Sequence, residues 1–126
     1  LPGKAIAREE MASYIRYLFK TVRKFFGEAV VVTQEVDDII SSPIVKETII
    51  NNSDCKILLD QRKYQNKFDQ IQNLLGLTDK ERAQILSINL ANAANRRYKE
   101  VWIGLGGTQS AVYATEVSGE EYLVRP

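Results

Sequence analysis

A short run of aliphatic residues, AVVV at positions 29–32, ends abruptly on Thr33 and Gln34 and narrows the folds open to this chain. An uninterrupted apolar run of this length predicts a strand over about 29–33 that is buried on both faces. Such strands belong to α/β proteins, in which helices cover both sides of the sheet. Ligands bind beyond the carboxyl ends of these strands. Thr33 and Gln34 are therefore either ligand-facing groups or ordinary polar residues that end a strand.

Helical periodicity and end-capping residues surround this run. The first predicted helix has apolar residues at helical spacing and Gly27 as its C-cap. The pair Ser42-Pro43 predicts the start of a second helix, and the TDKE pattern at 78–81 predicts a capping box. The predicted helices cover 5–26, 43–50, 64–75, 79–87 and 118–123.

Three further strands are predicted over 55–59, 100–105 and 109–117. The last two flank Gly106-Gly107-Thr108, which predicts a hairpin turn. This glycine-rich stretch is not expected to hold phosphate, because no helix and no Lys-Ser or Lys-Thr pair follows it. The pattern predicts one domain over 1–126 of the α/β class, with a mixed sheet flanked by helices and a C-terminal β-hairpin.

Composition restricts the chemistry open to this domain. The 126 residues include no His, which removes the commonest general base and the Ser-His-Asp triad. Cys55 opens a predicted buried strand and is expected to be an inert core thiol. The acids Glu35, Asp37 and Asp38 are expected to cap a turn rather than to bind a metal. We find no apolar run near the roughly 18 residues of a membrane span and no secretory signal pattern.

Two basic stretches stand out in a chain whose net charge is only +1. Arg16, Lys20, Arg23 and Lys24 recur at helical spacing within the first predicted helix. This stripe either meets the phosphate of a nucleotide or of DNA, or is a solvated helix face. The stretch 96–99, Arg-Arg-Tyr-Lys, is either a contact for a nucleic-acid strand or an exposed loop.

The sequence resembles a known family over about residues 4–123, with the resembling segments in the same order. These segments are the basic helix ending RKFFG, the run VVVTQ, SPIVKETIINN, LLGLTDKER and YKEVWIGLGGTQSAVYATEVS. They resemble the carboxy-terminal part of TraG-family conjugative-transfer ATPases, best matched by the Bacteroidales conjugative-element type. Members of that family are motors of type IV secretion-like systems that transfer plasmids or conjugative transposons.

The resemblance implies a RecA-like P-loop ATPase that works as a ring, commonly hexameric. The family's Walker A loop and Walker B acidic pair lie upstream of the resembling region, and this chain contains no G-x-x-x-x-G-K-[ST] motif. The chain is therefore expected to be the C-terminal portion of such a domain, cut from a longer protein or processed, since it begins at Leu1. ATP and Mg²⁺ would bind to the parent, whereas this segment alone would hold neither tightly and would be inactive.

The resemblance also assigns roles to residues and partners. Thr33 and Gln34 would face the γ-phosphate and its attacking water, with Gln34 sensing the nucleotide. Arg23 and Lys24 match the family's basic motif and are candidate cations for a phosphate, and Arg62 is a further candidate. The expected partners are copies of the same chain, other type IV secretion components and DNA. The parent is expected to be cytoplasmic and to reach the inner membrane only through that machinery.

The residues also leave open a function of another class. In this alternative the chain is a stand-alone module that binds DNA or a partner protein through the basic helix face.

Overall fold

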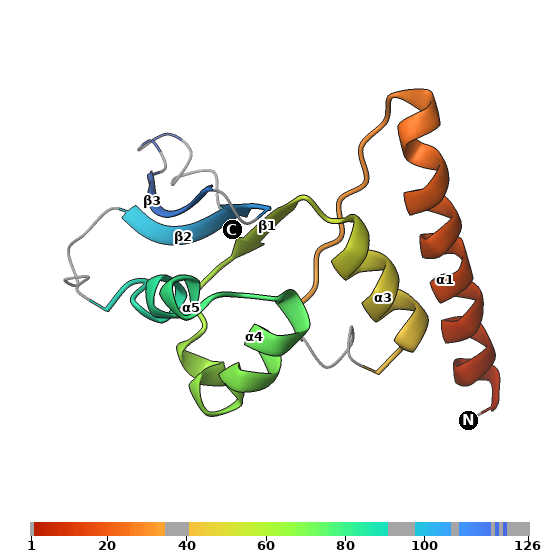
Figure 1. Ribbon diagram of the computed structural model, residues 1–126, viewed down its shortest axis with the longest axis horizontal. Helices are drawn as coiled ribbons and strands as arrows, with labels where there is room; N and C mark the ends of the chain where they lie inside the picture. The colour runs from red at the N-terminus through yellow and green to blue at the C-terminus, as the bar shows by residue number, and fades with distance from the viewer. Residues whose placement is uncertain are drawn as a thin grey trace. The chain divides into compact units, whose positions relative to one another are not determined.

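The computed structural model describes residues 2–34, 41–90, 98–106, 109–116, 118 and 120 (Figure 1). The chain divides into two compact units, an N-terminal unit, Leu1–Ser53, and a C-terminal unit, Asp54–Pro126. Helices and an antiparallel sheet together fit the predicted α/β class. The predicted turn at 39–40, the loop at 92–97 and most of the tail helix at 118–123 lie outside the described residues.

Two helices build the N-terminal unit. Helix α1 spans Pro2–Thr21 and packs side by side with α3, Pro43–Asn52 (Figure 1). The predicted start of α3 is confirmed, because the Ser42 Oγ accepts a hydrogen bond from the Val45 N–H at 3.4 Å and Pro43 fills the first turn. Over residues 9–21 of α1 and the whole of α3, the buried residues are Ala12, Phe19, Thr48 and Ile49.

The end of the first helix differs from the prediction. After α1 the backbone tightens into the 3-10 helix η1, Val22–Phe25, and the left-handed residue that ends it is Phe26, with φ of 56°, not Gly27. The Phe26 N–H donates to the Arg23 carbonyl at 3.2 Å and the Gly27 N–H to the Val22 carbonyl at 3.0 Å. Gly27 is needed for close packing instead, since a Cβ there would lie 2.8 Å from the Val22 Cγ2.

The predicted buried strand over 29–33 is wrong for this structure. Residues 27–34 form neither helix nor strand, and no described strand pairs with them. The side chains of Val30 and Val32 are 82% and 88% exposed. A strand buried on both faces depends on neighbouring strands and covering helices, and the described residues of the N-terminal unit supply no neighbouring strand.

The apolar side predicted for the first helix is also only partly buried. Phe19 is buried as expected, and Ile15, Leu18 and Val22 are half-buried. The side chains of Met11, Phe25 and Phe26 were placed on the same apolar side, but they are exposed. Two causes act together: among the described elements, α3 is the helix against which α1 packs, and the change to a 3-10 helix at Val22 rotates the residues that follow it.

A three-stranded sheet forms the C-terminal unit, with strands in the order β1-β2-β3. Strand β1 is Cys55–Leu58, β2 is Tyr98–Leu105 and β3 is Gln109–Glu116. Leu105 pairs with Gln109, so the predicted hairpin is confirmed. The predicted mixed sheet is wrong for the described strands, because both ladders are antiparallel.

Helices cover one face of this sheet. The 3-10 helix η2, Arg62–Lys67, leads into α4, Phe68–Leu75, and α5, Asp79–Leu86, follows and contacts β2 and β3. The capping box at the start of α5 is confirmed, and Gly76 ends α4 in the left-handed region as an ordinary C-cap. The core side chains that are almost fully buried are Phe68, Ile85, Ile88 and Trp102.

Trp102 is the centre of the sheet's buried face. Its Nε1–H donates to the Gln84 Oε1 at 3.0 Å, and the Ser110 Oγ donates to the same oxygen at 3.0 Å. Gln84 therefore joins α5 to two strands. Gly104, two residues along β2, leaves room for the indole, because a Cβ at this position would lie 2.8 Å from the Trp102 Cζ2.

The prediction that Cys55 is a buried thiol is wrong. Cys55 is exposed, as is Ile57, whereas Leu58 is buried. Side chains alternate between the faces of a strand, and β1 lies at the edge of the sheet. The short apolar run at 55–59 therefore reflects a strand with one covered face, not a strand covered on both.

Candidate functional site

Thr33 and Gln34 lie at the end of the irregular segment 27–34 of the N-terminal unit, and both are exposed. Their hydroxyl and amide follow the exposed valines directly. Glu35, Asp37 and Asp38, the acids weighed as a metal cluster, lie outside the described residues. Within the part of the chain that the structure describes, no group of three or more His, Cys, Asp or Glu side chains is placed to hold a metal ion.

Arg23 and Lys24 belong to the same unit and lie in η1, where both side chains are exposed. They occupy the last turn of a helical segment, where the helix dipole favours cations. Thr33 lies nine residues after Lys24 along an irregular backbone. Four of the five candidate residues are therefore in the N-terminal unit, on segments that the unit's small core does not cover.

Arg62 lies in the other unit, at the start of η2, and is tied to Asp60. The Arg62 Nε lies 3.1 and 3.0 Å from the two carboxylate oxygens of Asp60, and the Nη2 lies 2.7 Å from Oδ2. The backbone N–H of Arg62 also donates to the Asp60 Oδ1 at 3.0 Å, which makes an Asx-type turn. This hydrogen-bonded pairing holds the pKa of Asp60 below its ordinary value and raises the pKa of Arg62.

Asn89 links this ion pair to the sheet. Its Nδ2 donates to the Asp60 Oδ2 at 3.3 Å, while its Oδ1 accepts from the Glu100 N–H at 2.8 Å. The Glu100 Oε1 in turn accepts from the Asn89 N–H at 2.9 Å. Asn89 adopts φ of 61°, a region that Asn tolerates better than most residues. Asp60, which pairs with the guanidinium of Arg62, is thus linked through Asn89 to strand β2.

The sequence reading missed this polar network. An Asp two residues before an Arg is a recognisable signal for an Asx-type turn, so the Asp60 contact could have been predicted. The contribution of Asn89, 29 residues away from Asp60, depends on tertiary packing and carries no local signal.

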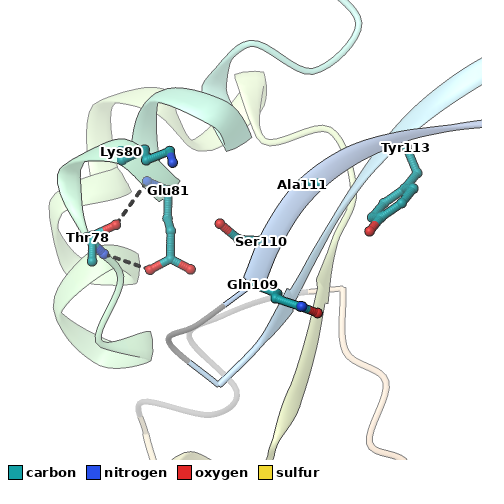
Figure 2. A pocket seen from close by; sticks show the side chains of 7 residues that line it. All are labelled: Thr78, Lys80, Glu81, Gln109, Ser110, Ala111 and Tyr113. Atoms are coloured by element: carbon teal, nitrogen blue, oxygen red, sulfur yellow. Dashed lines mark hydrogen bonds between the residues drawn. The ribbon is translucent and has the colours of Figure 1, made fainter.

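An open pocket of about 530 Å³ lies in the C-terminal unit between the start of α5 and strand β3 (Figure 2). The Ser110 hydroxyl points toward Glu81 across it, and dashed lines mark the two hydrogen bonds of the capping box. Thr78, Glu81 and Ser110 thus already have structural partners. The lining residues are Thr78, Lys80, Glu81, Gln109, Ser110, Ala111 and Tyr113. None of the five candidate residues lines it.

The described helices and antiparallel sheet fit an α/β fold, and comparison with known families adds the class of protein. The family model described as TraG P-loop domain matches residues 2–125. The chain therefore belongs to the TraG P-loop domain family, and the resemblance found in the sequence is confirmed. This membership supports a P-loop NTPase related to conjugation. No curated protein and no solved structure matches the chain.

Proposed function

We propose that this chain is the C-terminal segment of a motor ATPase that powers a conjugative DNA-transfer or secretion machine. The observation that carries the proposal is the TraG P-loop domain match, which extends over residues 2–125. In this proposal the chain is one part of a RecA-like domain, and the Walker A and Walker B motifs belong to the parent. ATP and Mg²⁺ bind in the parent, and the segment by itself does not turn over nucleotide.

In this proposal Thr33 and Gln34 sense the γ-phosphate, and Gln34 orients the attacking water. The exposed valines at 30 and 32 support the idea, because an apolar segment of this kind gains stability when neighbouring strands cover it. Strands of the parent protein beside this segment would fix the direction of the Thr33 hydroxyl and the Gln34 amide at its end. Positioning of this kind is most of what a protein contributes to phosphoryl transfer.

The three candidate cations lie in different surroundings. Arg23 and Lys24 are exposed at a helix end, where phosphate of a bound nucleotide or a neighbouring subunit can approach. Arg62 is engaged with Asp60, so it would have to share its guanidinium or exchange its partner. Arg23 and Lys24 also match the family's basic motif, and on that ground we place Arg62 behind them as a candidate for stabilising charge on the transferred phosphoryl group.

The partners follow from the same proposal. The parent assembles as a ring of identical subunits, hexameric by resemblance, and contacts DNA and other type IV secretion components. It works in the cytoplasm at the inner membrane, which it reaches through those components. Among the described helices, none has the length and apolarity needed to cross a bilayer.

The first test is to read the gene upstream of the Leu1 codon. We expect an in-frame Walker A loop and an apolar strand that ends in Asp-Glu. A start codon near Leu1 without these motifs would overturn the motor proposal. It would favour the alternative, a stand-alone module that binds DNA or protein through the basic helix face.

The second test uses the protein that this gene encodes. Gln34→Ala is expected to lower the kcat for ATP hydrolysis by about 100-fold, because water positioning acts mainly in the transition state, and to leave KM for ATP within a few-fold. The control is Gln70→Ala on the exposed surface of α4, which is expected to keep full activity. Equal activity of the two variants would remove the sensing role of Gln34. ATP turnover by the purified 126-residue chain, lost in Gln34→Ala, would contradict the inactivity of the segment.

A further inference from the structure

The end of the first helix carries exposed aromatic and cationic side chains close together along the chain. Tyr17, Lys20 and Lys24 follow at helical spacing of three and four residues, and Phe25 and Phe26 come directly after them. All five side chains are exposed; Tyr17 is 63%, Phe25 78% and Phe26 98% exposed. The buried residues Ala12 and Phe19 mark the side of α1 that packs toward α3. We call these five residues the basic-aromatic surface.

The backbone that presents the two phenylalanines is well defined. Phe26 occupies the left-handed region, an uncommon place for a bulky residue, and two backbone hydrogen bonds close the turn around it. Such conformations cost free energy and recur at binding and active sites. Within this unit the side chain gains almost no burial in return, since it is 98% exposed. A ligand that covers the Phe26 ring would therefore gain the free energy of burying it.

The charge around these aromatics selects the kind of ligand. Residues 14–28 contain four cations and one acid, Glu28, which gives this stretch a net charge of +3 in a chain of net charge +1. Lysine is depleted in the cores of protein–protein interfaces, which makes an apolar protein face a poor match. A nucleic-acid strand matches both features, because its phosphates pair with cations and its bases stack on aromatic rings.

We propose that the basic-aromatic surface binds single-stranded nucleic acid, with Lys20 and Lys24 at phosphates and Tyr17, Phe25 and Phe26 stacking bases. Bases in a duplex are already stacked on one another, so the exposed rings favour a single strand. The inference deepens the proposed function, because it gives the motor a direct contact to the DNA, and it rests on that function for the presence of DNA. It needs no nucleotide at Thr33 and Gln34.

The test measures binding of a fluorescently labelled oligothymidine of about 15 nucleotides to the 126-residue chain by anisotropy. We expect affinity that falls steeply between about 50 and 200 mM salt, and weaker binding to a duplex of equal length. Phe26→Ala is expected to weaken binding about five- to hundred-fold at every salt concentration. Lys20→Gln is expected to reduce the slope of log affinity against log salt by about 0.7.

Matched controls come from the other unit. Tyr113→Ala on β3 and Lys80→Gln on α5 remove an exposed aromatic and an exposed cation of the C-terminal unit, and neither is expected to change the affinity. Circular dichroism melting verifies that each variant remains folded. The inference would be overturned if the chain does not bind oligothymidine at low salt. It would also be overturned if Phe26→Ala and Tyr113→Ala lose the same amount of affinity.

A protein partner would give a different result. If Phe26→Ala abolishes self-association in sedimentation while oligothymidine affinity stays unchanged, the surface is a contact between copies and the nucleic-acid inference fails. The reading of the upstream gene is independent of all these outcomes. If the basic-aromatic surface does not bind nucleic acid, the motor proposal still stands. If the motor proposal fails, the measured affinity for oligothymidine is unaffected.

Discussion

The two units of the chain differ in how much of their apolar surface they bury. In the C-terminal unit, Phe68 and Ile88 are completely buried, and Gln84 ties α5 to the sheet. Among its residues whose burial is described, the N-terminal unit buries little beyond Ala12, Phe19 and the middle of α3, and leaves two phenylalanines and three valines exposed. Four of the five candidate residues lie in the less covered N-terminal unit. The comparison shows that burial is concentrated in the C-terminal unit, whereas the candidate residues are concentrated where less apolar surface is covered.

The largest expected effect contrasts one phenylalanine from each unit. Phe68→Ala is expected to lower the free energy of unfolding by about 3–5 kcal/mol, because it leaves a cavity in a closed core. Phe26→Ala removes the same atoms from an exposed position and is expected to change the free energy of unfolding by less than about 0.5 kcal/mol. Urea unfolding followed by far-ultraviolet circular dichroism measures both. Similar losses in the two variants would break the comparison, since they would place Phe26 in a core.

A smaller effect compares the helix caps of the two units. Thr78→Ala removes the 3.1 Å hydrogen bond that the Glu81 N–H donates to the Thr78 Oγ1, one of the two bonds of the capping box, and is expected to cost about 1 kcal/mol. Ser42→Ala removes one bond of 3.4 Å and is expected to cost about 0.5 kcal/mol. Thr78→Ser keeps the hydroxyl and serves as the control in the same unfolding assay. A larger loss in Ser42→Ala than in Thr78→Ala would show that the N-terminal unit depends more on its helix start than its contacts indicate.

The smallest effect concerns pH and the Asp60–Arg62 pair. Because Arg62 holds the pKa of Asp60 below its unfolded value, the carboxylate stabilises the fold above that unfolded value, near pH 4, and its contribution disappears as pH falls through the lowered pKa. Arg62→Gln is expected to make the unfolding midpoint in urea less dependent on pH between about pH 5 and pH 3. Lys67→Gln, an exposed cation of η2, is the control. An unchanged pH profile in Arg62→Gln would show that the pair does not persist in solution.

The parts of the fold that the sequence predicted correctly depend on neighbours along the chain. The cap at Ser42 and the capping box at Thr78 each follow from a few adjacent residues. The hairpin between β2 and β3 is equally local. Such features can be read from single residues because the groups that satisfy the backbone lie within one turn.

The parts that failed depend on residues far along the chain. A run of valines predicts a buried strand only if another strand lies beside it, and the described part of the N-terminal unit has none. Cys55 was placed in a core because the sequence cannot show that β1 would be an edge strand. The roles of Thr33, Gln34, Arg23 and Lys24 came from family resemblance, and they stay predictions. Their chemistry depends on groups that the spacing of residues in this chain does not supply.

Gly104 and Trp102 show how the core of the hairpin limits the variation of this sequence over evolutionary time. Any side chain at 104 would push the indole away from its place against α5, and the hydrogen bond to Gln84 would be lost with it. A smaller residue at 102 alone would leave a hollow that glycine cannot fill. The two positions can therefore drift only as a pair. In related proteins that have replaced both residues, we expect a larger residue at 104 together with a smaller one at 102.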